Sequence, residues 1–379
     1  MIRRRVLLLF GLALVACLGA LSLTPAPPLA AADLPARIAD RAFWRMISDF
    51  SEPNGYFHSD NFMSNEKAFQ LVIPELTKTL APEGVYIGVG PEQNFTYLVA
   101  LRPKIAFIID IRRQNMLEQL LYKALIELSA DRAEFLSRLY SRPRPAGLGA
   151  DSTVDTLFEE YERATPQSGL FDQNLLAAKH QLVVHHGFAL TEDDLKGIEH
   201  VFSVFYAGGP NLNYSFSPGG GGAFGWFPTY KDLMTETDGA GEHRGYLATE
   251  DGFRILSRLE NNNLIIPVVG DFAGPKAIRS VGRYLKEHGA TVTAFYTSNV
   301  EQYLFQQDDD WRKFFANVAT LPTAPSSTFI RSVTNRGFQY QAFNAGRRSM
   351  PRLCSIEDLL KAFDERRIAS YSDVIRMSK

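Results

Sequence analysis

The sequence predicts an α/β fold: a Rossmann-like, doubly wound and mainly parallel sheet with helices on both faces. Short apolar or β-branched runs alternate with helical patterns over most of the 379 residues. Two of these runs, residues 104–111 and 264–272, show little polar alternation, so we expect strands buried on both faces. A hydrophobic content of 45% excludes intrinsic disorder, and a formal net charge of −2 argues against nucleic-acid binding through a basic surface.

The N-terminal segment, residues 1–32, predicts a secretory signal peptide. Basic Met1–Arg5 precede the apolar run Val6–Leu23, and a proline-rich stretch leads to Ala30–Ala32, which fits the signal-peptidase pattern. We therefore expect an exported protein, either periplasmic or secreted. Two alternatives remain open, because Leu14–Cys17 matches the motif before a lipidated cysteine and the apolar run is of marginal length for an uncleaved membrane anchor.

The first part of the remaining chain alternates helical and β patterns. Ser64 can accept a backbone N–H bond at the start of a helix. The β-branched run that ends in Gly88 and Gly90 gives a strong strand signal, and Pro103 ends the helical pattern after it. In order, we expect a helix at 37–50, a helix at 65–80, a strand at 85–90, a helix at 93–101 and a strand at 104–111.

Helical patterns dominate the middle of the chain. Five leucines recur at helical spacing within residues 113–129, and a mostly helical insertion follows at 130–199. Residues 201–207 (VFSVFYA) predict a strand, because β-branched and aromatic residues dominate this run. A helix at 249–260 and the strand at 264–272 restore the alternation.

The next elements continue the same order toward a sheet edge. Pro275 can open a helix that Gly289 ends, after which residues 291–297 predict a strand and the chain from Val300 is helical again. Two β-runs, 328–333 and 338–343, flank a short turn and predict an antiparallel C-terminal hairpin at or near the sheet edge.

These patterns predict one folded domain. It spans residues 37–345, carries the helical insertion, and is followed by a C-terminal helical tail at 346–379.

Candidate ligand contacts follow the first two predicted strands, where a doubly wound sheet collects its ligands. Gly88 and Gly90 allow a tight turn and close approach of a ligand to the backbone, and Glu92 stands where a third glycine is usual. Asp110 ends the second strand about 20 residues further on, where a carboxylate can accept hydrogen bonds from ribose hydroxyls. Pro91 removes a backbone donor, so the loop suits a nucleoside without a diphosphate.

These residues carry a family resemblance. Residues 85–110 resemble the first motif and the acidic second-strand end of class I S-adenosylmethionine-dependent methyltransferases. Residues 40–345 are more closely similar to an uncharacterised bacterial family described only as a methyltransferase-like domain of unknown function. That likeness is carried by these stretches: 59–61, 88–94, 109–112, 269–275 and 295–304. The resemblance implies a methyltransferase-type Rossmann fold with S-adenosylmethionine as cofactor and Gly88, Gly90 and Asp110 as its contacts.

Polar residues after the later strands can serve chemistry or local structure. Asp271 can orient or deprotonate a nucleophile, and it can equally cap the following helix. Ser298 and Asn299 can line the same crevice, although we favour a helix cap for them. Asp60 and Asn61, which follow Tyr56 and His58, fit either a loop folded over the pocket or a simple turn.

Four further features have both a functional and a structural interpretation. The glycine- and aromatic-rich residues 216–227 suit a lid or a plain surface loop. His180, His185 and His186 lack a metal-binding motif, so we predict no metal site. Cys354 fits a structural thiol, and Arg112 can reach an anionic ligand.

Two functions follow from these expectations. The first is a methyltransferase-like enzyme that binds S-adenosylmethionine and a small-molecule acceptor. The second is a non-catalytic ligand-binding module of the cell envelope on the same scaffold. Neither involves nucleic acid, and a membrane enters only through the N-terminal segment. A third option is an interaction domain without a ligand.

Overall fold

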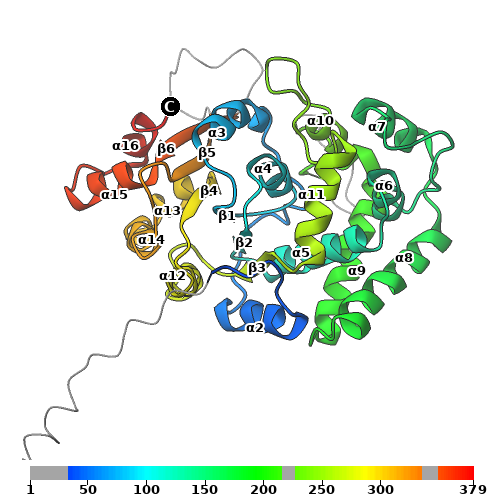
Figure 1. Ribbon diagram of the computed structural model, residues 1–379, viewed down its shortest axis with the longest axis horizontal. Coiled ribbons are helices and arrows are strands. Elements are labelled where there is room, and N and C mark those ends of the chain that lie inside the picture. Colours follow the sequence, from blue (N-terminus) through cyan, green and yellow to red (C-terminus); the bar gives the residue numbers. More distant parts are fainter. Residues whose placement is uncertain (1–32, 216–226, 335–348) are drawn as a thin grey trace, which may run out of the picture. The chain divides into compact units, whose positions relative to one another are not determined.

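The computed structural model describes residues 33–215, 227–334 and 349–379, and Asp33–Lys379 form one compact unit. Its centre is a six-stranded sheet in the order β3-β2-β1-β4-β5-β6 (Figure 1). The strands are β1 Val85–Gly88, β2 Ile105–Asp110, β3 Ile265–Val269, β4 Val292–Ser298, β5 Thr328–Thr334 and β6 Ser349–Ser355. Strands β1 to β5 run parallel, and β6 pairs antiparallel with β5. The prediction of a mainly parallel α/β sheet is confirmed.

Helices surround this sheet. They are α2 Asp40–Phe50, α3 Ile73–Thr79, α4 Gln93–Leu101, α5 Arg113–Glu127, α6 Arg132–Tyr140, α7 Val154–Arg163, α8 Ser168–His180, α9 Glu192–Gly208, α10 Tyr230–Met234, α11 Glu250–Asn261, α12 Ala277–Glu287, α13 Val300–Leu304, α14 Asp310–Val318, α15 Ile356–Asp364 and α16 Tyr371–Arg376. Short turns of other helix types are η1 Phe69–Val72, η2 Gln181–His185 and η3 Gly209–Asn211. No helix in the described ranges is long and apolar enough to cross a membrane.

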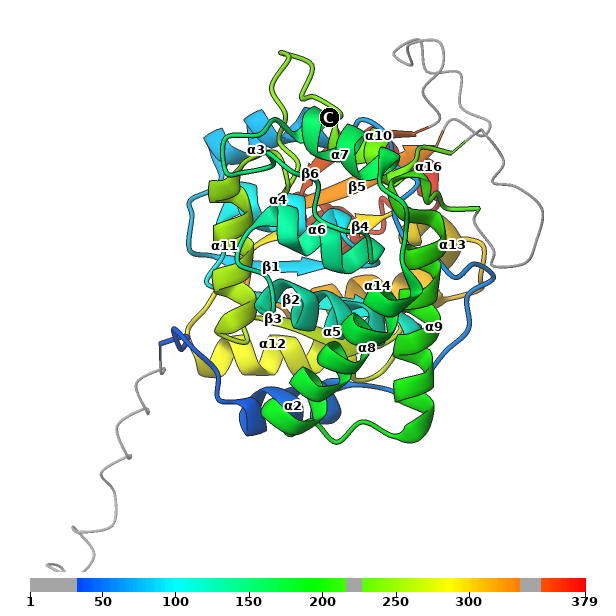
Figure 2. The ribbon, with the colours of Figure 1, turned by 90° about the vertical axis from the view of Figure 1, so that its right-hand side faces the viewer.

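Alternate residues of β4 show that helices cover both faces of the sheet. Phe295 packs against Phe314 of α14, whereas its neighbour Tyr296 packs against Tyr97 of α4. Successive side chains of a strand point to opposite faces, so α14 and α4 lie on opposite sides. Helices α6 to α9 form a flank on the α5 side, which faces the viewer in Figure 2.

The expected strand at 201–207 is wrong, because these residues belong to α9. Thr191 and Asp194 form a capping box that starts this helix. Ile198, Val201 and Phe205 are buried at helical spacing, and they pack this helix against the core. The helical insertion therefore continues through residue 208.

The antiparallel partner of β5 also differs from the expected one. Residues 338–343 lie outside the described residues, and β5 pairs instead with β6 at Ser349–Ser355. The sheet edge does have an antiparallel strand, but β6 lies within residues 346–379, which we expected to be a helical tail. Only the later part of that tail, with α15 and α16, is helical.

A loop that follows α2 crosses the carboxyl ends of the strands. The Glu52 N–H donates to Val269 O at 2.8 Å, and the Gly55 N–H donates to Ile111 O at 2.9 Å. The Glu52 carboxylate accepts from the N–H groups of Lys276 and Ala277, so it caps α12 from a distant part of the sequence. This loop closes one side of the cavity described next.

Candidate functional site

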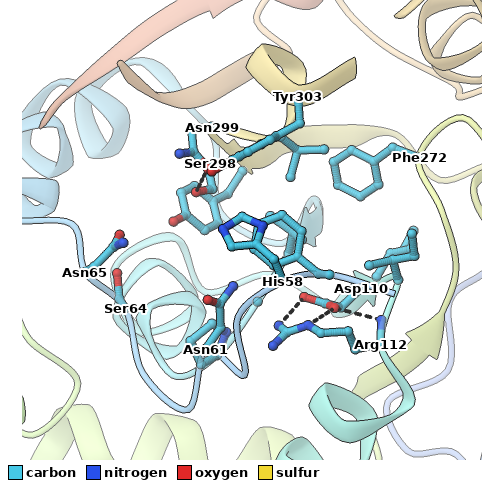
Figure 3. A pocket seen from close by; sticks show the side chains of 18 of the residues that line it. His58, Asn61, Ser64, Asn65, Asp110, Arg112, Phe272, Ser298, Asn299 and Tyr303 are labelled. Carbon is cyan, nitrogen blue, oxygen red and sulfur yellow. Dashed lines mark hydrogen bonds and ion pairs between the residues drawn. The ribbon is translucent and has the colours of Figure 1, made fainter. Parts of the chain in front are cut away.

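A cavity of about 320 Å³ lies at the carboxyl ends of β1, β2 and β4. The strand order turns back between β1 and β4, which is the position where doubly wound sheets bind ligands. The wall is made by the loop at 56–66, the loop after β1, the end of β2 and the start of α13 (Figure 3). Of the residues predicted from sequence, the cavity is lined by Tyr56, His58, Asn61, Gly90, Asp110, Arg112, Asp271, Ser298 and Asn299.

The glycine loop after β1 is held open by Asn94. The Asn94 amide donates to the carbonyls of Val89 at 3.0 Å, Gly90 at 3.2 Å and Pro91 at 2.8 Å. Gly90 has a φ of +79° and lines the cavity, and a Cβ built there would meet nothing within 4 Å. A Cβ on Gly88 would lie 1.9 Å from Asn94 Oδ1, so Gly88 makes room for Asn94 and is not part of the cavity wall.

Asp110 and Arg112 form a buried ion pair on the cavity wall. Asp110 Oδ1 accepts from the Arg112 N–H at 2.9 Å and from Nε at 3.0 Å, and Oδ2 accepts from the guanidinium at 3.0 Å. Burial alone would lower the pKa of Arg112, but the Asp110 carboxylate raises it. The guanidinium also donates to the carbonyls of Ser59 and Asp60, so the pair fastens the loop over the cavity. Of the two residues with alternative interpretations in this loop, Asn61 is part of the cavity wall, whereas Asp60 is not part of the wall and contributes its carbonyl to Arg112.

Asp271 lies at the cavity wall after β3, and it does not cap α12. Its Oδ1 accepts from the Ala273 N–H at 2.8 Å, which closes a short turn. Glu52 caps the helix instead, so the capping alternative for Asp271 is wrong. Burial raises the pKa of this carboxyl above its usual value.

Ser298 and Asn299 do not cap α13 either. Asn299 is the residue before this helix, and its side chain makes no capping hydrogen bond. Ser298 Oγ donates to Glu66 Oε1 instead. The cavity-lining interpretation of both residues is therefore the one that the geometry supports.

Glu66 is the principal site residue that the sequence interpretation missed. It is 6% exposed and lines the cavity, where it accepts from Tyr296 Oη at 2.9 Å, from Gln93 Nε2 at 3.2 Å and from Ser298. Burial raises the pKa of Glu66, and hydrogen bonds from these three side chains and Ser332 oppose the rise. The sequence interpretation placed Glu66 in a helix at 65–80. In the structure, the helical turns begin only at Phe69, so Glu66 belongs to the loop before them.

Glu92 occupies a buried position behind the glycine loop and is not among the residues that line the cavity. Its Oε1 accepts from the Ser64 N–H at 3.3 Å, and its Oε2 has no hydrogen-bond partner among the described residues. Burial raises the pKa of Glu92 to about 7. Glu118 of α5 is also buried, and burial together with the charge of Glu92 raises the pKa of Glu118. Through the Ser64 N–H, Glu92 joins the glycine loop to the loop at 56–66.

The remaining predicted features lie away from the cavity or outside the described chain. His186 contacts Asp40 and Glu127, and no group of three potential metal-binding side chains occurs in the part of the chain that the structure describes. Cys354 is a buried thiol of β6. The glycine-rich residues 216–226 lie outside the described residues.

The fold and the cavity define an α/β protein with a ligand-sized pocket at the turning point of its sheet. The chain belongs to the DUF7790 family, a domain of unknown function, whose family model matches residues 61–376. Comparison with curated proteins gives no match.

Proposed function

We propose that this protein binds S-adenosylmethionine in the cavity and transfers its methyl group to a small-molecule acceptor. The observation that carries the proposal is the meeting of the Gly90 loop, Asp110 and Asp271 around one cavity at the carboxyl ends of the strands. A cavity of this size falls at the lower end of the range of about 300–1,000 Å³ that small-molecule sites occupy.

The chemistry of the wall suits an adenosine group. Ile109, Ile111 and Phe272 offer apolar surface for a purine ring, and the Asp271 carboxylate can accept from an exocyclic amino group. Arg112 uses three of the roughly four acceptor positions of the Asp110 carboxylate, so one position on Oδ2 is left for a ribose hydroxyl.

S-Adenosylmethionine supplies an electrophilic methyl group, and enzymes that use it depend mainly on positioning the two reactants. The residues of this chain would bind and orient the ligands and exclude water. The loop at 56–66, fastened by Arg112, is suited to the last of these tasks.

Calorimetry with S-adenosylmethionine and S-adenosylhomocysteine tests the proposal directly. We expect binding of both ligands, and we expect Asp110→Asn to weaken it about tenfold, because one hydrogen bond to a charged group is lost. The asparagine keeps an oxygen for Arg112, which limits the damage to the fold. Asp194→Asn is a matched control, because Asp194 also holds a two-pronged arginine, Arg113, but lies outside the cavity wall. Absence of binding at millimolar ligand would refute the proposal.

The second candidate is a binding module without catalysis. The ion pair between Arg112 and Asp110 favours this second candidate. Because Arg112 already bonds to the Asp110 carboxylate, fewer acceptor positions remain for a ribose than the resemblance implies. A protein that binds S-adenosylhomocysteine but transfers no methyl group to any of a panel of amines, alcohols and thiols would support this candidate.

A further inference from the structure

The end of the cavity opposite Asp110 is lined by hydroxyl groups next to a buried carboxylate. Two hydroxyl groups on its wall, Tyr296 Oη and Ser298 Oγ, both bond to the Glu66 carboxylate. Figure 3 shows Ser298 and Asn299 at one end of the pocket and the Asp110–Arg112 pair at the other, with His58 between them.

The direction of these hydrogen bonds follows from the charge of Glu66. A bound ammonium group favours the ionised form of Glu66, against the burial that raises its pKa. The ionised carboxylate can only accept, so both hydroxyls then donate to it. Each hydroxyl group has one hydrogen, and each is therefore left with oxygen lone pairs for anything in the cavity. Gln93 Nε2 also donates to Glu66 Oε2 at 3.2 Å, so the carboxylate is held by a third side chain. A hydroxyl group can donate or accept a hydrogen bond. Because Tyr296 and Ser298 donate their hydrogens to Glu66, both present acceptors to the cavity.

The charge of the cavity wall also favours a ligand that donates hydrogen bonds. Among the described residues that line the cavity, Glu66, Asp110 and Asp271 are acidic, and the single Lys or Arg is Arg112. The Arg112 guanidinium is already paired with Asp110. A positively charged donor is therefore stabilised in this cavity, and an anion is disfavoured.

We infer that Tyr296, Ser298 and Glu66 form a subsite for the ammonium group of an organic amine. Tyr296 and Ser298 contact the amine, and Glu66 is a positioning residue that sets the direction of both hydroxyls and supplies negative charge. The subsite rests on these contacts and on the charge of the wall, and it does not depend on the proposed function.

Benzylamine and benzyl alcohol are a suitable pair of probes, because they have nearly the same shape and differ in charge and in donor capacity. Ligand-observed NMR titrations give both affinities. We expect the protein to prefer the amine about tenfold, as for hydrogen bonds to a charged donor. Glu66→Gln should abolish the preference, because the new amide donates to one hydroxyl and turns that hydroxyl's proton toward the cavity.

The controls separate this effect from charge in general and from loss of folding. Asp308→Asn removes one negative charge from an exposed position next to cavity-lining Gln307, and we expect it to keep the preference. Tyr296→Phe removes one acceptor and leaves Glu66 in place, so it should weaken benzylamine binding and leave benzyl alcohol binding nearly unchanged.

Equal binding of the two probes by the unmodified protein, or an unchanged preference in Glu66→Gln, would overturn the inference. A titration of the same samples with S-adenosylmethionine distinguishes this result from failure of the proposed function. A protein that prefers benzylamine but binds no S-adenosylmethionine would retain the subsite and lose the methyltransferase proposal.

Discussion

His186 lies between two carboxylates, far in sequence from either. Its Nδ1 is 2.9 Å from Asp40 Oδ1 and its Nε2 is 2.6 Å from Glu127 Oε2, while its ring stacks on Phe188. Burial lowers the pKa of His186, but the hydrogen bond and charge of Glu127 and the hydrogen bond of Asp40 outweigh that effect and raise it. The opposing cation Lys123 also bonds to Glu127. This network joins α2 to α5 through His186.

The raised pKa makes the contribution of His186 dependent on pH. The stabilisation is fully present below the unfolded value of about 6.5 and is lost as pH rises through the higher folded value. We expect His186→Phe, which keeps an aromatic ring against Phe188, to lower the free energy of unfolding by about 2 kcal/mol at pH 6. Asp40 and Glu127 each lose a charged hydrogen-bond partner, although Asn263 and Lys123 still bond to them. The difference from the unmodified protein should shrink toward pH 9.

Urea unfolding at pH 6 and pH 9 measures this effect. His200→Phe is the control, because His200 is exposed, its ring packs against Phe62, and it forms no ion pair with another described residue. A His186→Phe penalty that is the same at both pH values would show that the ring is needed for packing alone.

At the scale of single elements, the turn from β1 into α4 depends on Asn94. This side chain is fully buried, donates to three loop carbonyls and accepts from Tyr86 Oη at 2.9 Å. We expect Asn94→Ala to lower the free energy of unfolding by about 2–3 kcal/mol, because the carbonyls and the tyrosine lose their partner. Urea unfolding measures the loss. Asn261→Ala, on the exposed face of α11, should change stability by less than about 0.5 kcal/mol.

The two outcomes of the Asn94 variant differ in their meaning for the site. Weaker binding of S-adenosylmethionine by a variant that still folds would support a role of the loop in ligand binding. A variant as stable as the unmodified protein would contradict the view that Asn94 holds the loop.

The two apolar runs that we expected to be buried on both faces are confirmed as strands. Residues 104–111 contain β2 and residues 264–272 contain β3, because a continuous apolar run needs cover on both sides and a parallel sheet offers it. The strands expected at 291–297 and 328–333 are confirmed as β4 and β5. The same local logic failed at 201–207. The β-branched residues of this run are helical, because the capping box and the apolar spacing that extends back to Ile198 outweigh local β propensity.

Site residues that directly follow a strand could be predicted from the sequence. Site residues whose backbone conformation depends on contacts with distant parts of the chain could not. Asp110, Asp271 and Ser298 follow strand ends, so the topology alone brings them together. Glu66 depends instead on the turn at Ala68, which has a φ of +68° and whose N–H donates to both carboxylate oxygens of Glu236, 168 residues away. No local pattern indicates such a contact.

At the scale of the whole molecule, the cavity draws on segments spread along most of the domain. Its wall includes residues from Tyr56 to Gln307, and the Glu301–Arg331 ion pair, fully buried, joins α13 to β5 beside it. Because both the loop at 56–66 and α13 are fixed to the sheet, ligand binding should be coupled to global folding. The site is a property of many described segments taken together, from Tyr56 to Gln307, and not of one motif.

The cellular compartment that contains the folded domain bears on the choice between the two proposed functions. S-Adenosylmethionine is made in the cytosol, so an exported enzyme would lack a source of it, whereas an exported binding module would not need one. We expect a C-terminal fusion of alkaline phosphatase at Lys379 to be active outside the cytosol, because residues 1–32 have the charge and hydrophobic pattern of an export signal. The same fusion without residues 1–32 is the control and should be inactive.

N-terminal sequencing of the exported protein tests cleavage, and the sequence should begin after Ala32 if the signal is removed. An inactive full-length fusion would contradict export and remove the main objection to the methyltransferase, since the domain would then face its cofactor.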